Sequence, residues 1–286
     1  MKIPLPRPSL LLALLLAPAF ASADDAKPRL FAAPDTAKPV LEKVDILDLV
    51  KKGEVEYNIN YKADPEANDP PEKVFLLQEN GDLHITGKAW GYMSTKAAYR
   101  DYHLVLEFKW TGPTWGKRVE RTRDSGLLIH SHGSHGALGG TFCASVEAQI
   151  IEGGMGDILV LSPKLPDGTV YQTRVEAEFE LDRDGEKRWK KGAPRQEVLS
   201  GRINWEKRDE DWVDKIGFRG EHDPDKPVGE WNKLEVIAKG DYLKYIFNGE
   251  VVNEAFAVSP SAGPIGIQTE AAGLMVRRYE LLPLED

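Results

Sequence analysis

The sequence predicts an all-β protein, a β-sandwich or jelly roll that folds as a single domain. Many short runs rich in β-branched and aromatic residues are separated by Gly, Pro and Asn-Gly turns. No amphipathic stretch of helical length and no internal repeat interrupts these runs. The chain has 286 residues, of which 41% are hydrophobic, so it has enough apolar side chains for a core of its own.

The first 23 residues have the pattern of a secretory signal peptide. A basic start, Met1–Arg7, precedes the short apolar run Leu10–Phe20 and the small-residue sequence Ala21–Ala23. The run is too short to span a bilayer, and no other segment is long and apolar enough to do so. We therefore expect an exported protein, periplasmic or extracellular, in which residues 24–42 are a linker and residues 43–286 are the domain.

Charge and cysteine content exclude two further classes of protein. The formal net charge of −9 argues against nucleic acid as a partner, whereas a neutral sugar would not be repelled. The single cysteine, Cys143, excludes an intramolecular disulfide. We expect Cys143 to be a small buried residue rather than a nucleophile.

Strand-like runs follow one another from residue 82 to the C-terminus. In Tyr102–Trp110, alternation places Tyr102 and every second residue after it on one face, which predicts a half-buried strand. Asn248-Gly249 predicts a hairpin with a type I′ turn, because that turn needs positive φ at both positions. The other predicted strands are Asp82–Gly87, Gly126–Ser131, Ala144–Ile151, Ile158–Leu161, Thr169–Phe179, Leu234–Lys239, Tyr242–Phe247, Val251–Phe256, Ile265–Thr269 and Leu274–Leu281.

One highly charged segment, Glu180–Asp225, interrupts this rhythm. It carries Trp189, Trp205 and Trp212, and it is longer than most connections in a compact domain. One interpretation is a solvated β-hairpin insertion. The other is a lid or wall over a site, with a tryptophan that stacks on a sugar.

A candidate site lies in the stretch Asp124–Gly154. Here a loop rich in Gly and His separates two predicted strands. On the second strand, alternation places Glu147 and Gln149 on one face, opposite Val146 and Ala148. A row of polar groups on one face, beside a histidine-rich loop, is typical of a site for a polar ligand.

A series of short motifs resembles the 3-keto-disaccharide hydrolase domain family. They occur in the family's order at Asp82–Gly87, Tyr99–Tyr102, Asp124–Gly126, Val146–Gly153, Gly229–Asn232, Phe247–Gly249 and Gly263–Gln268. The resemblance covers about residues 44–283 and implies a secreted bacterial protein with a concanavalin- or laminin-G-like jelly roll. Two departures concern the substrate: Asp124 stands where Asn is usual, and Glu180–Asp225 is longer than the usual connection.

The resemblance implies cleavage of glycosides that have been oxidised to a ketone at C3 of the sugar. Such a ketone acidifies the proton on C2, so that a general base can remove it. The resulting enolate is stabilised by hydrogen-bond donors or a cation, and the glycosidic oxygen leaves from C1 with a proton. Addition of water then makes the net reaction a hydrolysis, without the oxocarbenium-like state of ordinary glycosidases.

Glu147 is the candidate base, because a carboxylate within an apolar strand is costly unless it is paired or used. Alternatively, Glu147 is a carboxylate on a solvated face of the sheet, or it forms a salt bridge with a neighbouring arginine. Gln149 is a candidate donor to a sugar hydroxyl or to the ketone, or else a structural amide. His130, at a strand end, is a second candidate acid or base. Arg123 is a candidate for polarising the ketone, or else a surface arginine.

Five further residues complete the predicted site. Asp124 is expected to accept a hydrogen bond from substrate or to fix the turn after it. Gln268 and Glu270 alternate on one strand and are expected on the same polar face. Trp90 is a candidate sugar-stacking platform or a core residue. His132 is a candidate substrate ligand, although a solvated loop histidine is the alternative.

No cofactor is predicted. His130, His132 and His135 have the spacing His-x-His-x-x-His, which could gather three imidazoles around a metal but matches no strong zinc motif. Jelly rolls of this kind often hold structural calcium, for which Glu152 and Asp157 are the candidate ligands.

A lectin-like carbohydrate-binding module is the alternative function, because one fold can serve both binding and catalysis. An enzyme requires Glu147 near a second titratable group, within hydrogen-bond reach and at the floor of a pocket. A binding module would instead present a shallow surface with aromatic side chains and no such pair.

Overall fold

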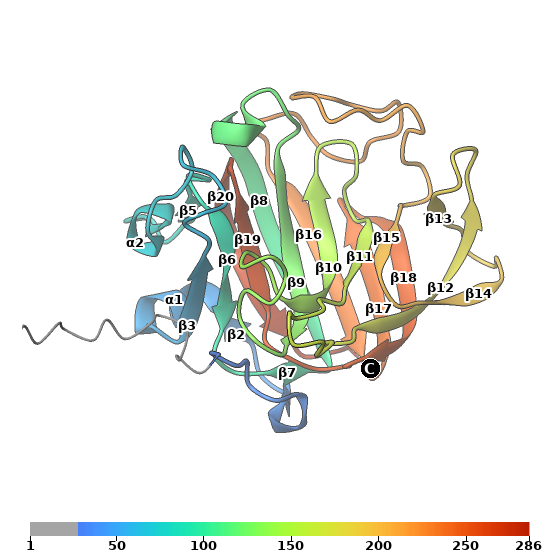
Figure 1. Cartoon of the computed structure of the whole chain (residues 1–286), viewed down its shortest axis with the longest axis horizontal. Coiled ribbons are helices and arrows are strands. Elements are labelled where there is room, and N and C mark those ends of the chain that lie inside the picture. The colour runs from blue at the N-terminus through green and yellow to red at the C-terminus, as the bar shows by residue number, and fades with distance from the viewer. Residues whose placement is uncertain (1–27, 286) are drawn as a thin grey trace, which may run out of the picture.

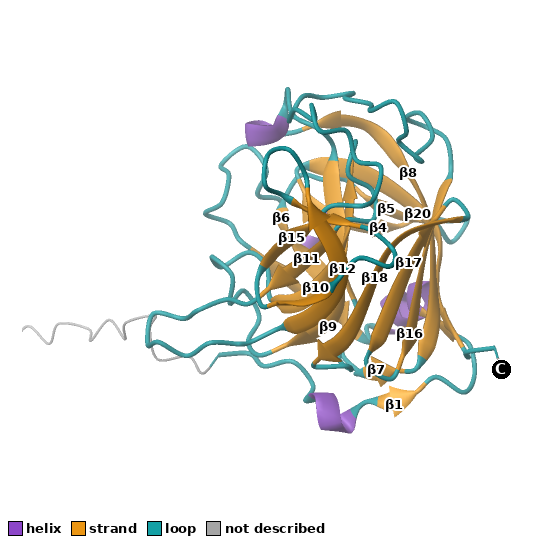
Figure 2. Cartoon of the chain, turned by 90° about the vertical axis from the view of Figure 1, so that its right-hand side faces the viewer, coloured by secondary structure: helices purple, strands orange, loops and turns teal. Residues whose placement is uncertain are grey.

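The structure is a computed structural model that describes residues 28–285, and it shows two antiparallel sheets packed face to face (Figures 1 and 2). The fold class is therefore confirmed as an all-β sandwich. The predicted signal peptide, residues 1–23, lies outside the described residues.

The first sheet has seven strands among the described residues. Their order is β15 (Gly201–Ile203), β11 (Ile158–Leu161), β10 (Ala144–Ile151), β9 (Asp124–His132), β19 (Gly266–Glu270), β6 (Trp90–Thr95) and β3 (Val55–Ile59). The candidate site lies on this sheet, which we call the site sheet.

The second sheet is larger. Its order is β13 (Lys187–Trp189), β12 (Arg174–Leu181), β18 (Glu250–Ser259), β17 (Tyr242–Phe247), β16 (Asn232–Lys239), β8 (Tyr102–Thr114), β20 (Ala272–Leu282), β5 (Leu83–Ile85) and β4 (Phe75–Leu77). Two further strands pair beside this path, β14 (Arg195–Val198) on β12 and β2 (Val44–Asp45) on β20. We call this the back sheet.

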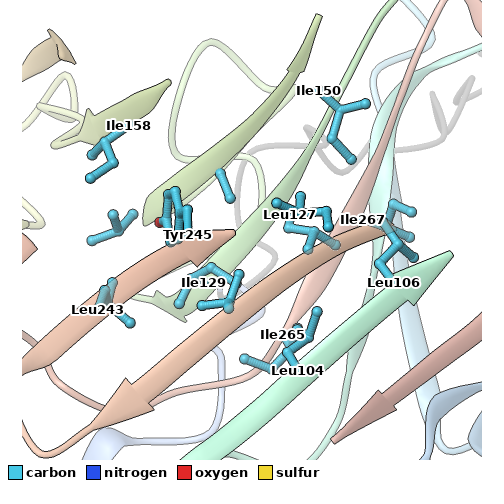
Figure 3. Close-up of a cluster of buried hydrophobic side chains, with 14 of the residues drawn as sticks. Leu104, Leu106, Leu127, Ile129, Ile150, Ile158, Leu243, Tyr245, Ile265 and Ile267 are labelled. Atoms are coloured by element: carbon cyan, nitrogen blue, oxygen red, sulfur yellow. The ribbon is translucent and has the colours of Figure 1, made fainter. Parts of the chain in front are cut away.

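The core lies between the sheets and is built from the inward face of each strand (Figure 3). Leu104 and Leu106 of β8 point inward from the back sheet, and Leu127 and Ile129 of β9 point inward from the site sheet. The face predicted for Tyr102–Trp110 is confirmed, because its members are fully buried in this core. Because side chains alternate along a strand, the other residues of these strands point away from the core, to the outer face of each sheet.

The turn prediction is also confirmed. Asn248 and Gly249 both have positive φ, 48° and 90°, and they join β17 to β18. Helices are short. Asp45 caps α1 (Ile46–Lys52) by accepting from the Leu47 and Asp48 amides, and α2 (Pro71–Val74) is a single turn. Among residues 28–285, none of the helices is long and apolar enough to cross a membrane.

Two segments differ from the sequence-based expectation. The described part of the predicted linker follows the domain surface: β1 (Lys38–Pro39) pairs with β7 (Tyr99–Arg100), and Phe31 donates its amide to Gly133. The charged segment Glu180–Asp225 contributes strands to both sheets, since β15 extends the site sheet and β14 pairs with β12. It is thus part of the sandwich edge, where β13 and β14 both pair antiparallel with β12.

Candidate functional site

The polar face predicted for β10 lies on the outer side of the site sheet. Val146, Ala148 and Ile150 belong to the core, so Glu147 and Gln149 point outward. Each of these two side chains is nevertheless only 3% exposed. The alternative of a solvated carboxylate therefore does not apply to Glu147.

Gly126 of β9 makes room for the Glu147 carboxyl. A Cβ at this position would lie 2.3 Å from Oε1 of Glu147 and 2.9 Å from Oε1 of Gln268. The carboxyl of β10 and the amide of β19 therefore meet above a residue without a side chain. Any larger residue at position 126 would displace the Glu147 carboxyl or the Gln268 amide.

Two more carboxylates are held together by one arginine at the adjoining end of the sheet. Nη2 of Arg118 donates to Oδ2 of Asp124 at 2.5 Å and to Oε1 of Glu270 at 3.0 Å. The other Asp124 oxygen, Oδ1, accepts from Nε2 of Gln149 at 2.8 Å. Asp124, Gln149 and Glu270 thus form one buried network from β9, β10 and β19.

Burial and mutual repulsion raise the proton affinity of all three carboxyls. The pKa of Glu147 lies well above its usual value, because the group is desolvated and because Glu270 and Asp124 are close. Burial and the charge of Asp124 raise the pKa of Glu270 to about 8, against the opposing effect of Arg118. Burial raises the pKa of Asp124 to about 6, again opposed by Arg118. Glu147 therefore has titratable neighbours, Glu270 and Asp124, that shift its pKa.

Two amide oxygens in this cluster have no partner. Oε1 of Gln149 and Oε1 of Gln268 are buried without a hydrogen bond among the described residues. Unpaired buried acceptors are rare in native proteins and mark places where a donor is missing. The hydroxyl groups of a sugar are donors of the right kind.

Trp90 lies at the end of β6, directly opposite Glu270 in the sheet register. The Arg118 guanidinium stands over its ring at 5.5 Å. The ring is half-buried and does not belong to the main core. This position fits a wall of the site better than the core-filling alternative.

The side chains of the three histidines have partners outside this cluster. A bulge in β9 gives His130 a φ of 56°, and Nε2 of His130 lies 3.1 Å from the hydroxyl of the core residue Tyr102. Burial lowers the pKa of His130 to about 3. The His130 side chain therefore enters the core, away from the outward-facing Glu147, and the geometric basis for its acid or base role is lost. Simple alternation after Ile129 would direct the His130 side chain outward, and the bulge directs it into the core instead.

The other two histidines also have local partners. His132 is half-buried, and its Nδ1 lies 3.1 Å from the carbonyl oxygen of His130. His135 lies between the hydroxyl of Tyr92 at 3.0 Å and Oε2 of Glu56 at 2.9 Å. Among residues 28–285, no group of three His, Cys, Asp or Glu side chains is arranged to hold a metal ion.

Arg123, Glu152 and Asp157 are engaged in structural ion pairs. Nη1 of Arg123 lies 2.6 Å from Oε1 of Glu152, so this arginine is directed away from the carboxylate cluster. Asp157 binds Arg202 at 2.8 Å and also binds Arg208. The two candidate calcium ligands therefore have arginines as partners. Cys143 is fully buried, and burial raises its pKa to about 12, so the prediction of a buried, unreactive cysteine is confirmed.

The sequence analysis missed two arginines that lie near the carboxylate cluster. Arg118 lies in the short 3₁₀ helix η2 (Gly116–Arg118), and Arg202 lies on β15 within the charged segment. Arg202 acts on the pKa values of Glu147, Asp124 and Glu270 alike. Neither residue stands in a recognisable motif. Arg118 meets Asp124 and Glu270 from the end of a short 3₁₀ helix, and Arg202 approaches the cluster through strand pairing.

The protein is thus a β-sandwich with buried carboxyls and unpaired amide oxygens on one outer face. Residues 55–281 match the family described as the 3-keto-alpha-glucoside-1,2-lyase-like domain, and the chain belongs to this family. The resemblance inferred from the sequence motifs is thereby confirmed. No curated protein matches the chain.

Solved structures show more distant similarity. A proposed glycosyl hydrolase from Parabacteroides distasonis shares 18% identity, with a TM-score of 0.44, over 80% of this chain and 100% of that one. The carbohydrate-binding module CBM66 from Bacillus subtilis shares 11% identity, with a TM-score of 0.37, over 75% and 92%. The β-glucanase of Bacillus licheniformis shares 8% identity, with a TM-score of 0.40, over 81% and 92%.

Proposed function

We propose that the protein cleaves the glycosidic bond of 3-keto-glycosides, including 3-keto-disaccharides, by removing the proton on C2. The observation that carries this proposal is the Glu147 carboxyl, buried over Gly126 beside Gln268, with its pKa raised by burial and by Glu270 and Asp124. Family membership supports the same reaction class.

Glu147 is the proposed base. A raised pKa makes its ionised form a stronger base than an ordinary glutamate, which suits a weakly acidic C–H group. The C2–H bond breaks, the C1–C2 double bond forms, and the C1–O1 bond breaks. The proton held by Glu147 then passes to O1 of the leaving group, and water adds to the unsaturated sugar.

The surrounding groups bind the sugar and stabilise the enolate. The Gln268 and Gln149 amide oxygens accept hydrogen bonds from sugar hydroxyls. The positive charges of Arg118 and Arg202 offset the negative charge that develops on O3 of the substrate. Trp90 forms one side of the ring site.

The direct test uses a nitrophenyl 3-keto-glucoside, the matching glucoside without the ketone, and the 3-keto compound deuterated at C2. We expect release of nitrophenol from the oxidised sugar alone, with slower turnover of the deuterated form. An unsaturated 3-keto sugar should be visible by mass spectrometry before water adds. Equal cleavage of the unoxidised glucoside would contradict the proposal. Sugar binding without any turnover would favour the lectin-like alternative.

The protein is further proposed to act outside the cytoplasm, after removal of the predicted signal peptide 1–23. Expression with a C-terminal tag, cell fractionation and N-terminal sequencing would test this. We expect a mature N-terminus at Asp24 in the exported fraction. An intact Met1 in the cytoplasmic fraction would contradict it.

A further inference from the structure

The outer face of the back sheet carries two adjoining pockets with a lysine between them, which together we call the basic strip. The first pocket has a volume of about 440 Å³ and includes Trp115, Met275 and His84 in its lining. The second has a volume of about 300 Å³ and includes Trp231 in its lining. Both volumes are in the range of sites for small ligands. The strip crosses β5, β20, β8 and β16, which are neighbours in the back sheet (Figure 1).

Strand register joins the two pockets into one surface. His84 of β5 stands opposite Met275 of β20, and Met275 stands opposite Lys109 of β8. The residues on either side of each of these three belong to the core, so the three side chains point away from it. Arg277 lines the second pocket two positions after Met275, a distance of about 7 Å along the strand. The second pocket therefore begins where the first one ends.

The length of the basic strip exceeds that of a single sugar ring. At the usual spacing between strands, the distance from β5 to β16 is about 14 Å. A ligand that contacts both pockets at once is therefore an extended molecule, such as an oligosaccharide.

Each pocket holds a tryptophan with a cation against its ring. Nζ of Lys88 lies 4.2 Å from the ring centre of Trp115. Nζ of Lys109 and Cζ of Arg277 lie 4.8 and 4.4 Å from the ring centre of Trp231. Both indoles are half-buried, so part of each ring remains accessible. An indole beside a cation suits a sugar that carries a carboxylate, because the ring packs against C–H groups while the cation pairs with the charge.

The first pocket is held open by its own contacts. Nε1 of Trp115 donates to the carbonyl oxygen of Thr86 at 3.0 Å, which fixes the orientation of the indole. Gly273 forms part of the lining without a side chain. A Cβ at this position would lie 2.5 Å from Oγ1 of Thr111, which also lines the pocket. The indole is thus oriented before any ligand binds, which lowers the entropic cost of binding.

The charge of the basic strip is opposite to that of the whole chain. The formal net charge of the chain is −9. Basic side chains nevertheless outnumber carboxylates in the strip, with Lys73, Lys88, Lys109, Lys226, Lys233 and Arg277 against Asp69 and Glu107. An anionic ligand is therefore attracted to this face, whereas the negative charge of the rest of the chain opposes a densely charged polymer such as nucleic acid.

We propose that the basic strip binds an acidic polysaccharide, a chain of sugars in which some residues carry a carboxylate. Sugar rings pack on Trp115 and Trp231, and the carboxylates pair with the lysines and with Arg277. The strip lies on the other sheet from the Glu147 cluster, so this inference does not depend on the proposed reaction. Binding here attaches the protein to a polysaccharide while the Glu147 cluster stays free for its own substrate.

Paired charge reversals test the strip while keeping the net charge matched. Lys73→Glu/Lys226→Glu reverses one exposed lysine in each pocket. Lys164→Glu/Lys239→Glu is the control, because it changes the net charge equally at two exposed lysines that line neither pocket. Trp231→Ala removes one aromatic platform without changing the charge, and circular dichroism checks that it folds.

Calorimetry at low ionic strength would measure binding of tetrasaccharides of galacturonate, glucuronate and mannuronate, with cellotetraose as the neutral comparison. We expect the wild type to bind at least one acidic tetrasaccharide more tightly than cellotetraose, and added salt to weaken this binding. Lys73→Glu/Lys226→Glu should lower the affinity about tenfold, the effect of two exposed ion pairs, and the control pair should match the wild type. Folded Trp231→Ala should also bind more weakly.

Three results would overturn the proposal. The first is that the wild type binds none of the acidic tetrasaccharides, or binds them no more tightly than cellotetraose. The second is that both lysine pairs lower the affinity equally, or that neither does. The third is that a single-stranded oligonucleotide or an anionic lipid vesicle binds the strip more tightly than the acidic sugars. Turnover of a methyl 3-keto-glucoside should be the same in both lysine pairs, and its complete absence would contradict the proposed reaction without affecting the strip.

Discussion

The outer faces of the two sheets carry the same types of charged residue but place them in opposite environments. On the back sheet, Glu235 of β16 lies 2.8 Å from Lys233 and 2.9 Å from His103, both of which reach solvent. On the site sheet, Glu147 has the amide of Gln268 beside it and other carboxyls as its nearest charges. Strand alternation alone does not distinguish these two glutamates.

Their pKa values move in opposite directions. Partial burial opposes ionisation of Glu235, but the hydrogen bonds and charges of Lys233 and His103 lower its pKa overall. Burial dominates at Glu147, and Glu270 and Asp124 reinforce it, so its pKa rises. Carboxylates that are paired with basic groups at the surface stabilise it weakly, whereas clustered, buried carboxyls keep their protons to higher pH. The latter arrangement marks a site rather than a surface.

The largest effect is expected from Glu147→Gln. Loss of a general base lowers kcat by about 10²- to 10⁴-fold, and the neutral amide keeps the shape of the side chain. The free energy of unfolding should not fall, because the substitution removes a buried group that resists ionisation. Stopped assays on a 3-keto-glycoside and thermal unfolding would measure both. Unchanged kcat in a folded variant would exclude Glu147 as the base.

Arg118→Met should produce the largest loss of stability. Arg118 is the partner of both Asp124 and Glu270, and removing one partner from a buried ionic network costs about 3–5 kcal/mol. The two carboxyls would then hold their protons still more strongly, so the loss should grow as pH rises. Urea unfolding at two pH values would measure this. A loss below about 1 kcal/mol would mean that the network is solvated.

The wild type should lose stability as pH rises from about 5 to 8. The pKa of Glu270 is 4.5 when unfolded and about 8 when folded, so the folded state binds the extra proton across this interval. The stabilisation is complete below pH 4.5 and is lost as pH rises through the folded value, with an upper bound of about 5 kcal/mol from a shift of 8 − 4.5 = 3.5 pKa units. Thermal unfolding of the wild type and Glu270→Gln would show this, since the variant should have a flatter profile. Stability that rises over this range would contradict the raised pKa.

The fold was predictable where each strand has one polar face. The Tyr102–Trp110 alternation and the Asn248-Gly249 turn both predicted the observed structure. The strand Trp90–Thr95 was missed because five of its six residues are buried, so its two faces show no contrast in polarity. The short strands within Glu180–Asp225 were missed because most of their residues are exposed and polar or charged, so that no alternation of polar and apolar residues is visible.

The site was predictable only in part, for a related physical reason. Alternation correctly put Glu147 and Gln149 on one face, but their burial depends on loops and strands far away in the sequence. Arg118 reaches Glu270 of a distant strand from a short 3₁₀ helix, and Arg202 approaches the carboxyls through pairing across the sheet. Local spacing in the sequence encodes neither of these long-range contacts. The bulge at His130 turned its side chain into the core, because one extra residue reverses a strand's alternation.

The smallest effect is expected from Glu235→Gln, the matched substitution on the back sheet. Its partners are the flexible Lys233, whose side chain is 42% exposed, and His103. Solvent screens such pairs, so the free energy of unfolding at pH 7 should fall by no more than about 1 kcal/mol, and kcat should be unchanged. Because its folded pKa is lowered, this carboxylate contributes stability above its unfolded value of 4.5 and loses it only as pH falls further. Between pH 5 and 8 the stability profile of Glu235→Gln should therefore parallel that of the wild type, whereas that of Glu270→Gln should not. If the two variants changed the profile alike, the contrast between the paired and the clustered carboxylates would not hold.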